Sequence, residues 1–131
     1  MLEQVATSSG INFKTECDDI DKLFTPEDEV TFYRIVQECV SNIVKHSKAK
    51  NAQVFIKKVE NQISVKISDD GIGFVSNDEE FTEKRVGFGL KGIEERVRML
   101  SGKLEIQSKN DVGTAILINF QTKQKIGRAH V

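Results

Sequence analysis

The first long pattern along the chain has the period of an α-helix. Apolar side chains recur every three or four positions between residues 26 and 47, a spacing that gathers them on one helix face. They are Phe32, Val36, Cys39, Val40, Ile43 and Val44. Thr25 suits the cap of this helix, and Pro26 suits its first turn, where three acidic residues follow. The pattern predicts a helix from Pro26 to about Ser47.

Alternating apolar and polar residues follow this helix, with the period of a half-buried β-strand. Two such stretches, 52–57 and 63–67, flank a turn at Glu60-Asn61 and predict a hairpin. A second helix is expected over residues 89–101. Further strands are expected at residues 11–15, 103–108 and 114–120. This order predicts an α+β fold, a two-layer sandwich with helices packed on one face of a mixed, mostly antiparallel sheet.

Composition adds limits to this picture. The chain has 131 residues, of which 38% are hydrophobic and 30% charged, as expected of one globular domain. The formal net charge of −1 does not favour nucleic acid as a partner, and no apolar run is long enough to cross a membrane, so no membrane contact is expected. Cys17 and Cys39 form neither a disulfide framework nor a metal-ligand spacing. Free thiols fit a cytoplasmic location.

Three parts are expected along the chain. Residues 1–10 would precede the fold, and residues 11–122 would be the folded domain. Residues 123–131 would be a disordered tail of the kind that cloning adds. The acidic and aperiodic stretch at 76–85 is expected to be a loop inside the domain.

Three glycines after this acidic stretch repeat the spacing of a dinucleotide-binding turn. Gly87, Gly89 and Gly92 spell G-x-G-x-x-G in front of the second expected helix. A NAD site needs a buried strand directly before the turn, whereas the charged stretch FTEKRV stands there. The pattern therefore argues against a NAD site. A flexible glycine loop that leads into an ordinary helix is the simpler interpretation of this segment alone.

Glu38 and Asn42 share one face of the first helix because they are four residues apart, and Arg34 and Lys45 extend the same side. An amide oxygen beside a carboxylate suits Mg²⁺ at a triphosphate, with the carboxylate as a base or a water-orienting group. A solvated polar stripe is the alternative. The spacing alone leaves both interpretations open.

A second group of candidates follows the hairpin in SDDGIGF, residues 68–74. Asp69 continues the buried row of the preceding strand, which costs free energy unless its carboxylate meets a donor such as the exocyclic amine of adenine. Asp70 belongs to the opposite face and is expected to be exposed. Gly71 and Gly73 allow a sharp turn and a close approach of a ligand to the backbone. The ordinary alternative is a strand end capped by a glycine turn.

Thr114, on the buried face of the last strand, completes a set of four motifs. Together the motifs resemble those of the GHKL, or Bergerat-fold, ATPase superfamily. They are Glu38 and Asn42 in QECVSNIVKHS, Asp69, Gly71 and Gly73 in D-x-G-x-G, Gly87 to Leu90 in GFGL, and Gly113-Thr114. FYRIVQECVSNIVKHSKAKNAQV and GFGLKGIEERVRMLSGKLEIQS are similar to the sensor histidine kinases whose acceptor domain is a short two-helix hairpin. Such kinases pair with response regulators that carry a helix-turn-helix (LuxR/NarL-like) output domain.

The resemblance implies ATP and Mg²⁺ as cofactors and a role for each motif. Asn42 would coordinate Mg²⁺, and Glu38 would orient or activate the attacking group. Asp69 would bind the adenine amine, with Thr114 helping through a water molecule. The other implied nucleotide contacts are Lys45, His46, Gly71, Gly73, Gly87, Gly89 and Leu90, with residues 75–86 as an ATP lid.

The implied function is that of a catalytic domain that transfers the γ-phosphoryl group of ATP to a histidine on a separate dimerisation domain, which then phosphorylates a response regulator. The implied parent is a homodimer, either cytoplasmic or the cytoplasmic part of a membrane-bound sensor. The resemblance also implies that residues 1–10 are a linker or the stump of a preceding acceptor domain, and residues 11–122 a histidine kinase-like ATPase domain. His46 lies inside an ATPase motif and His130 in the expected tail, so the chain is expected to bind Mg-ATP without autophosphorylation. An anti-sigma-type serine kinase on the same fold and a non-enzymatic docking remnant are the alternatives.

Overall fold

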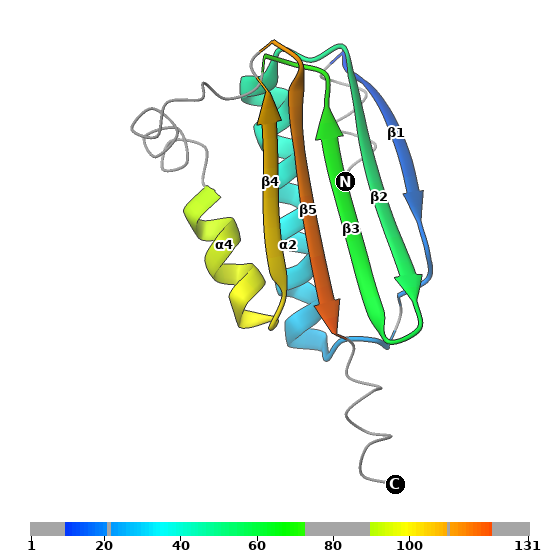
Figure 1. Ribbon diagram of the computed structural model, residues 1–131. Coiled ribbons are helices and arrows are strands. Elements are labelled where there is room, and N and C mark those ends of the chain that lie inside the picture. Colours follow the sequence, from blue (N-terminus) through cyan, green and yellow to red (C-terminus); the bar gives the residue numbers. More distant parts are fainter. Residues whose placement is uncertain (1–9, 21, 73–89, 110, 122–131) are drawn as a thin grey trace, which may run out of the picture.

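The computed structural model describes residues 10–20, 22–72, 90–109 and 111–121, so most of the expected linker and all of the expected tail lie outside the described residues. Within these ranges five strands form one sheet, and helices cover one of its faces (Figure 1). The strands are β1 (Asn12–Cys17), β2 (Asn51–Val59), β3 (Gln62–Asp69), β4 (Lys103–Lys109) and β5 (Gly113–Gln121). Their order is β1-β2-β3-β5-β4, with β1 parallel to β2 and the other neighbours antiparallel. The predicted α+β fold is confirmed.

Alternation along the strands determines which face of the sheet is buried. In β2 and β3 the residues that face the helices pair across the two strands, Val54 with Ile67 and Ile56 with Val65, and all four are almost fully buried. Glu60 adopts a φ of 54° in the tight connection between these strands, at the turn expected from the sequence. The hairpin and its buried face are therefore as predicted.

Two consecutive helices connect β1 to β2. α2 (Pro26–Asn42) begins where the hydroxyl of Thr25 accepts a 3.2 Å hydrogen bond from the backbone N–H of Asp28. The acidic residues of its first turn suit the positive end of the helix dipole. η1 (Ile43–Ser47) continues α2 as one π-helical turn and ends at Lys48, which has a left-handed φ of 55°. The predicted long helix is present, but its last turn is wider than an α-helix.

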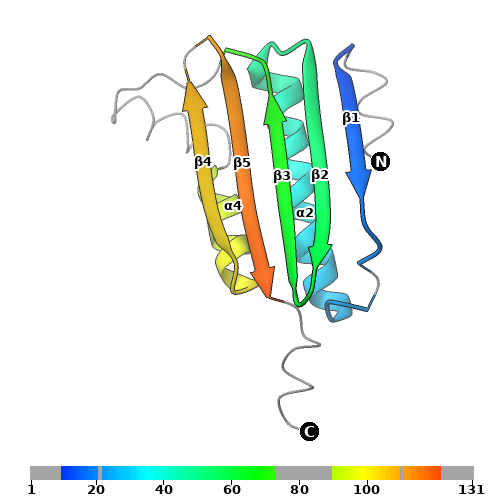
Figure 2. The same cartoon turned by 45° about the vertical axis from the view of Figure 1, so that its right-hand side comes forward.

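α4 (Leu90–Met99) lies beside α2 and runs in the opposite direction (Figure 1), and it lies behind β4 and β5 in the view of Figure 2. Its buried residues form the stripe expected from the sequence: Leu90, Ile93 and Val97, with Leu100 just beyond the helix. Gly102 follows and donates its backbone N–H to the carbonyl of Val97 at 2.9 Å. A Cβ on Gly102 would overlap the ring of Phe120, so this helix end requires glycine.

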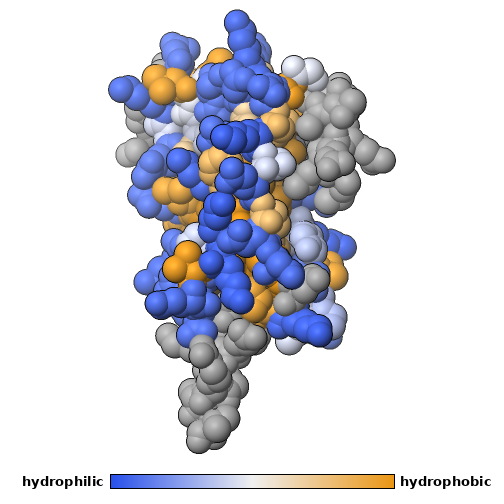
Figure 3. Space-filling model, turned by 90° about the vertical axis from the view of Figure 1, so that its right-hand side faces the viewer, coloured by the Kyte–Doolittle hydropathy of each residue, from blue (hydrophilic) through white to orange (hydrophobic). Residues whose placement is uncertain are grey.

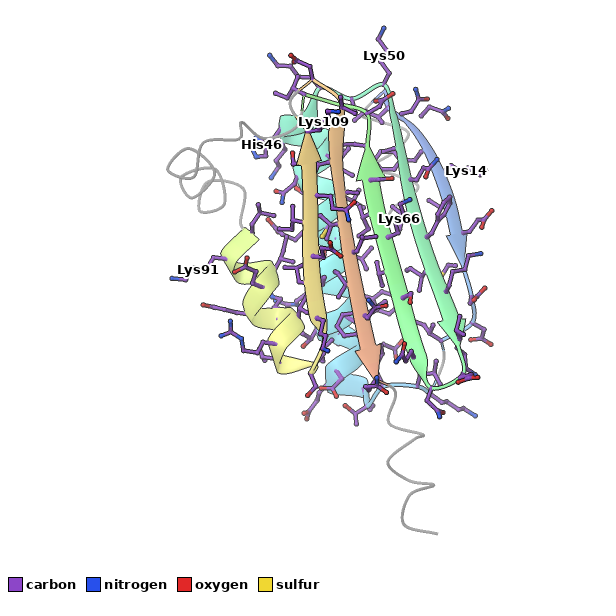
Figure 4. All side chains as sticks on the ribbon, viewed as in Figure 1. Lys14, His46, Lys50, Lys66, Lys91 and Lys109 are labelled. Atoms are coloured by element: carbon purple, nitrogen blue, oxygen red, sulfur yellow. The ribbon has the colours of Figure 1, made fainter. Side chains whose placement is uncertain are left out.

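The hydrophobic core lies between the helices and the sheet. Three of its rings, Phe24, Phe32 and Phe120, contact one another with centroid distances between 5.2 and 6.0 Å. None of the described helices covers the opposite face of the sheet, which carries side chains such as Lys66 (Figure 4). The surface seen from the β1 side is mostly hydrophilic, with separate hydrophobic patches (Figure 3).

No helix within the described ranges has both the length and the apolar character needed to span a membrane.

Candidate functional site

A cavity opens between the helices and the sheet, where α2 passes into η1, β3 ends and α4 begins. It encloses about 40 Å³, or about 450 Å³ with its open mouth. Its lining combines apolar and polar side chains: Cys39, Asn42, Ile43, His46, Ser47, Ile67, Asp69, Leu90, Thr114 and Ile116. Apolar walls with a few convergent polar groups are typical of a site for a small organic ligand.

Asp69 and Thr114 bring two polar side chains of the sheet into this cavity. They are register partners on β3 and β5, and both are partly buried. One carboxylate oxygen of Asp69, Oδ1, accepts a 2.8 Å hydrogen bond from the backbone N–H of Gly71. Burial raises the pKa of this carboxyl, although the N–H of Gly71 opposes the shift. A carboxylate that is partly removed from water gains when a ligand supplies a further donor.

Two glycines allow the backbone to pack closely around Asp69. A Cβ on Gly71 would overlap the backbone carbonyl of Ser47, whose oxygen accepts a 2.8 Å hydrogen bond from the N–H of Ile72. Gly113 has a φ of +136°, and a Cβ there would overlap the carbonyl oxygen of Asp69. Gly71 therefore serves a contact between two backbone segments, which joins the end of β3 to the end of η1.

Asp70 holds the segment that leads into β2. It is exposed, as expected, but its Oδ1 accepts hydrogen bonds of 2.9 Å from the backbone N–H groups of Lys50 and Asn51. Its Oδ2 accepts a third, also 2.9 Å, from the side-chain amide of Asn51. The hydrogen bonds from Asn51 are the main reason why the pKa of Asp70 is lowered. Asp70 thus fixes the chain after η1 beside Asp69 and so supports two walls of the cavity.

Asn42, the last residue of α2, lies on the helix side of the cavity. Its side-chain Nδ2 is buried and has no hydrogen-bond partner among the residues that the structure describes. An unpaired buried polar group costs about 1–3 kcal/mol, so it marks a place where a ligand can complete the hydrogen bonding. In the π-helical turn that follows, His46 lines the cavity whereas Lys45 is exposed. Single π-helical turns are frequent at functional sites.

Glu38 lies one helical turn before Asn42 but borders a different hollow. This hollow has a volume of about 330 Å³ and lies between α2 and α4. It is lined by Arg34, Gln37, Glu38, Ser41 and Arg96. Glu38 and Asn42, whose spacing on the helix suggested one joint site, thus line two neighbouring cavities.

The structure brings several of the expected site residues together in the cavity: Asn42, His46, Asp69, Leu90 and Thr114. Lys45 and Gly71 do not line it, since the first is exposed and the second is buried against Ser47. Gly73, Gly87 and Gly89, with the expected lid at 75–86, lie outside the described residues.

Sequence reasoning missed the apolar lining of the cavity. Cys39, a free cysteine, is fully buried there, and burial raises the pKa of its thiol to about 12. Ile67 and Ile116 line the cavity beside the polar pair. A signal for them was present, because they stand two positions from Asp69 and Thr114 and therefore share their strand faces.

Comparison with known proteins identifies a family match over most of the chain. The model of a family described as histidine kinase-, DNA gyrase B- and HSP90-like ATPases matches residues 27–124. Within the residues described here, no three or more His, Cys, Asp and Glu side chains are grouped so as to hold a metal ion.

Several similar proteins are sensor kinases. The chain is 40% identical over 87 residues to the sensor histidine kinase ComP of Bacillus subtilis, which covers 66% of this chain and 11% of ComP. It is 42% identical over 93 residues to the histidine-protein kinase/phosphatase DegS of Brevibacillus brevis, covering 70% of this chain and 23% of DegS. It is 30% identical over 117 residues to the oxygen sensor histidine kinase NreB of Staphylococcus carnosus, covering 89% of this chain and 33% of NreB. The chain thus spans a third or less of the length of these relatives.

Solved structures share the fold. The histidine kinase domain of the blue-light activated kinase EL346 from Erythrobacter litoralis superposes with a TM-score of 0.78 at 18% identity, over 95% of this chain and 58% of that one. The histidine kinase AdeS of Acinetobacter baumannii gives a TM-score of 0.70 at 15% identity, over 93% of this chain and 59% of the AdeS chain. At these identities the likeness concerns the fold alone.

Proposed function

Because this chain belongs to the family of histidine kinase-, DNA gyrase B- and HSP90-like ATPases, we propose that it is the catalytic domain of a two-component sensor histidine kinase. ATP is the ligand that the family implies, as expected from the sequence. In this proposal the domain transfers the γ-phosphoryl group to a histidine of a separate dimerisation domain in a homodimeric parent, and that histidine phosphorylates a response regulator. The names of the similar proteins support it.

The observation that carries the proposal is the arrangement of polar groups in the cavity. Asp69 and Thr114 lie next to each other on the sheet side, and Asn42 presents a buried amide without a partner on the helix side. The exocyclic amine of adenine would donate to the carboxylate of Asp69, and the apolar lining would cover the faces of the base. Asn42 would then meet the phosphate end of the nucleotide.

The surroundings of the cavity suit a triphosphate. α4 begins at Leu90 beside the cavity, and the N-terminus of a helix favours anions through its free N–H groups and its dipole. Lys50 and Lys109 lie at the same end of the molecule as His46 (Figure 4). Their positive charges would attract a nucleotide that carries several negative charges.

Asn42 also fits the proposed Mg²⁺, since its side-chain oxygen is a hard ligand, while its unpartnered Nδ2 would donate to a phosphate oxygen. When bound, the ion would neutralise charge on the phosphates. Glu38, outside the nucleotide cavity and beside the neighbouring hollow, would orient the acceptor histidine and take up its proton.

Calorimetric titration with ATP, with and without Mg²⁺, tests the assignment of the cavity. Asn42→Ala should abolish the Mg²⁺-dependent part of ATP binding, and Gln62→Ala, at an exposed position of β3 outside the cavity, is the control that should leave it unchanged. Unchanged Mg-ATP affinity in Asn42→Ala would count against the site. Phosphotransfer in trans to the parent's acceptor domain tests the reaction, because phosphohistidine is labile to acid whereas the phosphoserine made by a serine kinase on this fold is stable.

A further inference from the structure

The hollow between α2 and α4 contains only polar and charged lining residues, and it lies beside the proposed nucleotide site. Arg34, Gln37, Glu38 and Ser41 come from one side of α2, since they follow a spacing of three or four residues, and Arg96 comes from α4. Glu38 is one turn from Asn42, which lines the nucleotide cavity. A group bound in the hollow would therefore lie next to the phosphate end of the cavity.

Among the residues that the structure describes, neither arginine of this hollow has a carboxylate partner. Glu38 is four residues from Arg34 on α2. Within the described part of the chain, neither Arg34 nor Arg96 forms an ion pair with Glu38 or with another residue. Arg34 is exposed and Arg96 partly so. Two guanidinium groups and one carboxylate leave one positive charge uncompensated, which a single carboxylate from outside would balance.

Gly92 lies beside the guanidinium of Arg96. It stands in the interior of α4, where glycine costs about 1 kcal/mol relative to alanine, and it is not needed for an unusual backbone angle. A Cβ built on Gly92 would lie 3.7 Å from Nη1 of Arg96, an ordinary contact distance, so this guanidinium lies back along the helix beside Gly92. An acidic side chain at position 92 would therefore lie within reach of the guanidinium of Arg96.

We infer that the hollow is a docking site for a carboxylate of the protein that receives the phosphoryl group, an inference that rests on the proposed function. An aspartate or glutamate of that partner binds between Arg34 and Arg96, with Gln37 and Ser41 as further polar contacts. Planar guanidinium groups bind carboxylates with two parallel hydrogen bonds, which fixes orientation as well as position. Docking there sets the acceptor histidine beside Glu38.

The polar lining favours this occupant over a second nucleotide. A nucleotide base needs apolar or aromatic surface, which is found in the cavity lined by Ile67 and Ile116 and not among the residues that line the hollow. An acidic side chain needs only positive charge and donors, which the hollow supplies.

Phosphotransfer in trans is the experiment, with this chain, Mg-ATP labelled at the γ-phosphate, and the parent kinase's acceptor domain expressed separately. The concentration of the acceptor domain is varied, and ATP affinity is measured by calorimetry for every variant. Arg34→Ala and Arg96→Ala should each raise the KM for the acceptor domain about tenfold, with ATP affinity unchanged. Arg98→Ala, an exposed arginine of α4 outside the hollow, is the matched control and should leave KM unchanged.

Gly92→Glu adds an internal competitor, because its carboxylate would pair with Arg96 four residues later on the same helix. It should raise KM as the arginine variants do, whereas the uncharged Gly92→Gln should not, and both should melt no lower than the wild type. Equal KM values in the wild type and both arginine variants, or equal effects of Gly92→Glu and Gly92→Gln, would overturn the docking site. A wild-type domain that binds Mg-ATP but transfers nothing would instead overturn the proposed function, and the docking site with it.

Discussion

Replacing Asp69 with Asn keeps the shape of the side chain and changes what it offers to a bound base. In the wild type the carboxylate accepts a hydrogen bond from the backbone N–H of Gly71 and, in our proposal, another from the exocyclic amine of adenine. The oxygen of Asn can keep the bond from Gly71, but its amide nitrogen is a donor. That donor would face the donor of adenine, whereas guanine presents a carbonyl oxygen at the same place.

The expected loss follows from the type of hydrogen bond. A hydrogen bond to a charged group contributes about 1.5–3 kcal/mol, so its removal should weaken ATP binding by about 10- to 150-fold. GTP should lose nothing comparable, and the preference for ATP over GTP should fall by at least the same factor. Asp69→Ala should weaken ATP similarly, because it also removes the acceptor.

Stability should respond in the opposite sense. Burial raises the folded-state pKa of Asp69 above the ordinary 3.8. The folded domain therefore loses stability as the pH rises from 3.8 through the folded-state pKa, because the buried carboxyl must then ionise. Asp69→Asn removes this charge and keeps the bond from Gly71, so its melting temperature at pH 7 should equal or exceed that of the wild type. Asp69→Ala leaves the Gly71 N–H without that partner and should lose about 1–2 kcal/mol of unfolding free energy.

Isothermal titration calorimetry with ATP and GTP, together with thermal unfolding of the free domain followed by circular dichroism, measures both effects in the same samples. Two results would refute the reasoning. One is an Asp69→Asn variant that still prefers ATP over GTP as strongly as the wild type does. The other is an Asp69→Asn variant that melts as low as Asp69→Ala, since burial of the charge would then not be what raises the pKa.

Further predictions concern single positions around the cavity. Gly71→Ala forces a methyl group onto a backbone carbonyl of η1 and should cost about 3 kcal/mol in urea unfolding, whereas Gly92→Ala, with room for the methyl group, should be neutral or stabilising. The pKa of Asp70 is lowered in the folded domain, so its ionised form adds stability at pH values above the ordinary pKa of 3.8. This stability is lost as the pH falls through the folded-state pKa, and Asp70→Asn should therefore flatten the acid part of the melting-temperature profile. Cys39, with a pKa of about 12, should resist iodoacetamide at pH 8 in the folded domain while exposed Cys17 reacts, as peptide mass spectrometry would show; modification of Cys39 without denaturant would contradict its burial.

Local patterns predicted most of the fold because each element buries one face. The alternation around Val54 and Val65 and the helical stripe around Phe32 are consequences of that burial, and the structure confirms them. The order of the strands is a different matter. β5 lies between β3 and β4, and β1 pairs in parallel with β2, by contacts between segments far apart in the chain. Periodicity carries no information about such partners.

The site was predictable to a smaller extent. Period-two counting correctly placed Asp69 and Thr114 on buried faces, but only the sheet register shows that they are partners. The same counting described Asp70 as exposed and could not indicate that it accepts hydrogen bonds from Lys50 and from the backbone and side chain of Asn51, where β2 begins. The π-helical turn after Asn42 was not foreseen either, because a helical stripe in the sequence does not distinguish a turn of one width from another.

The position of the π-helical turn matters for the proposed reaction. Glu38 and Asn42 are separated by four residues of regular α-helix, which is about 6 Å along the axis and about 40° around it. That offset is enough for Asn42 to line the nucleotide cavity while Glu38 borders the hollow where the acceptor would dock. The wider turn begins at Ile43, directly after Asn42, so it can direct His46 toward the cavity without changing this separation. α2 also buries Ile35 and Cys39 completely. The distance between the two proposed roles is therefore set by a helix that is fixed to the core, and not by a loop that would have to be ordered at each turnover.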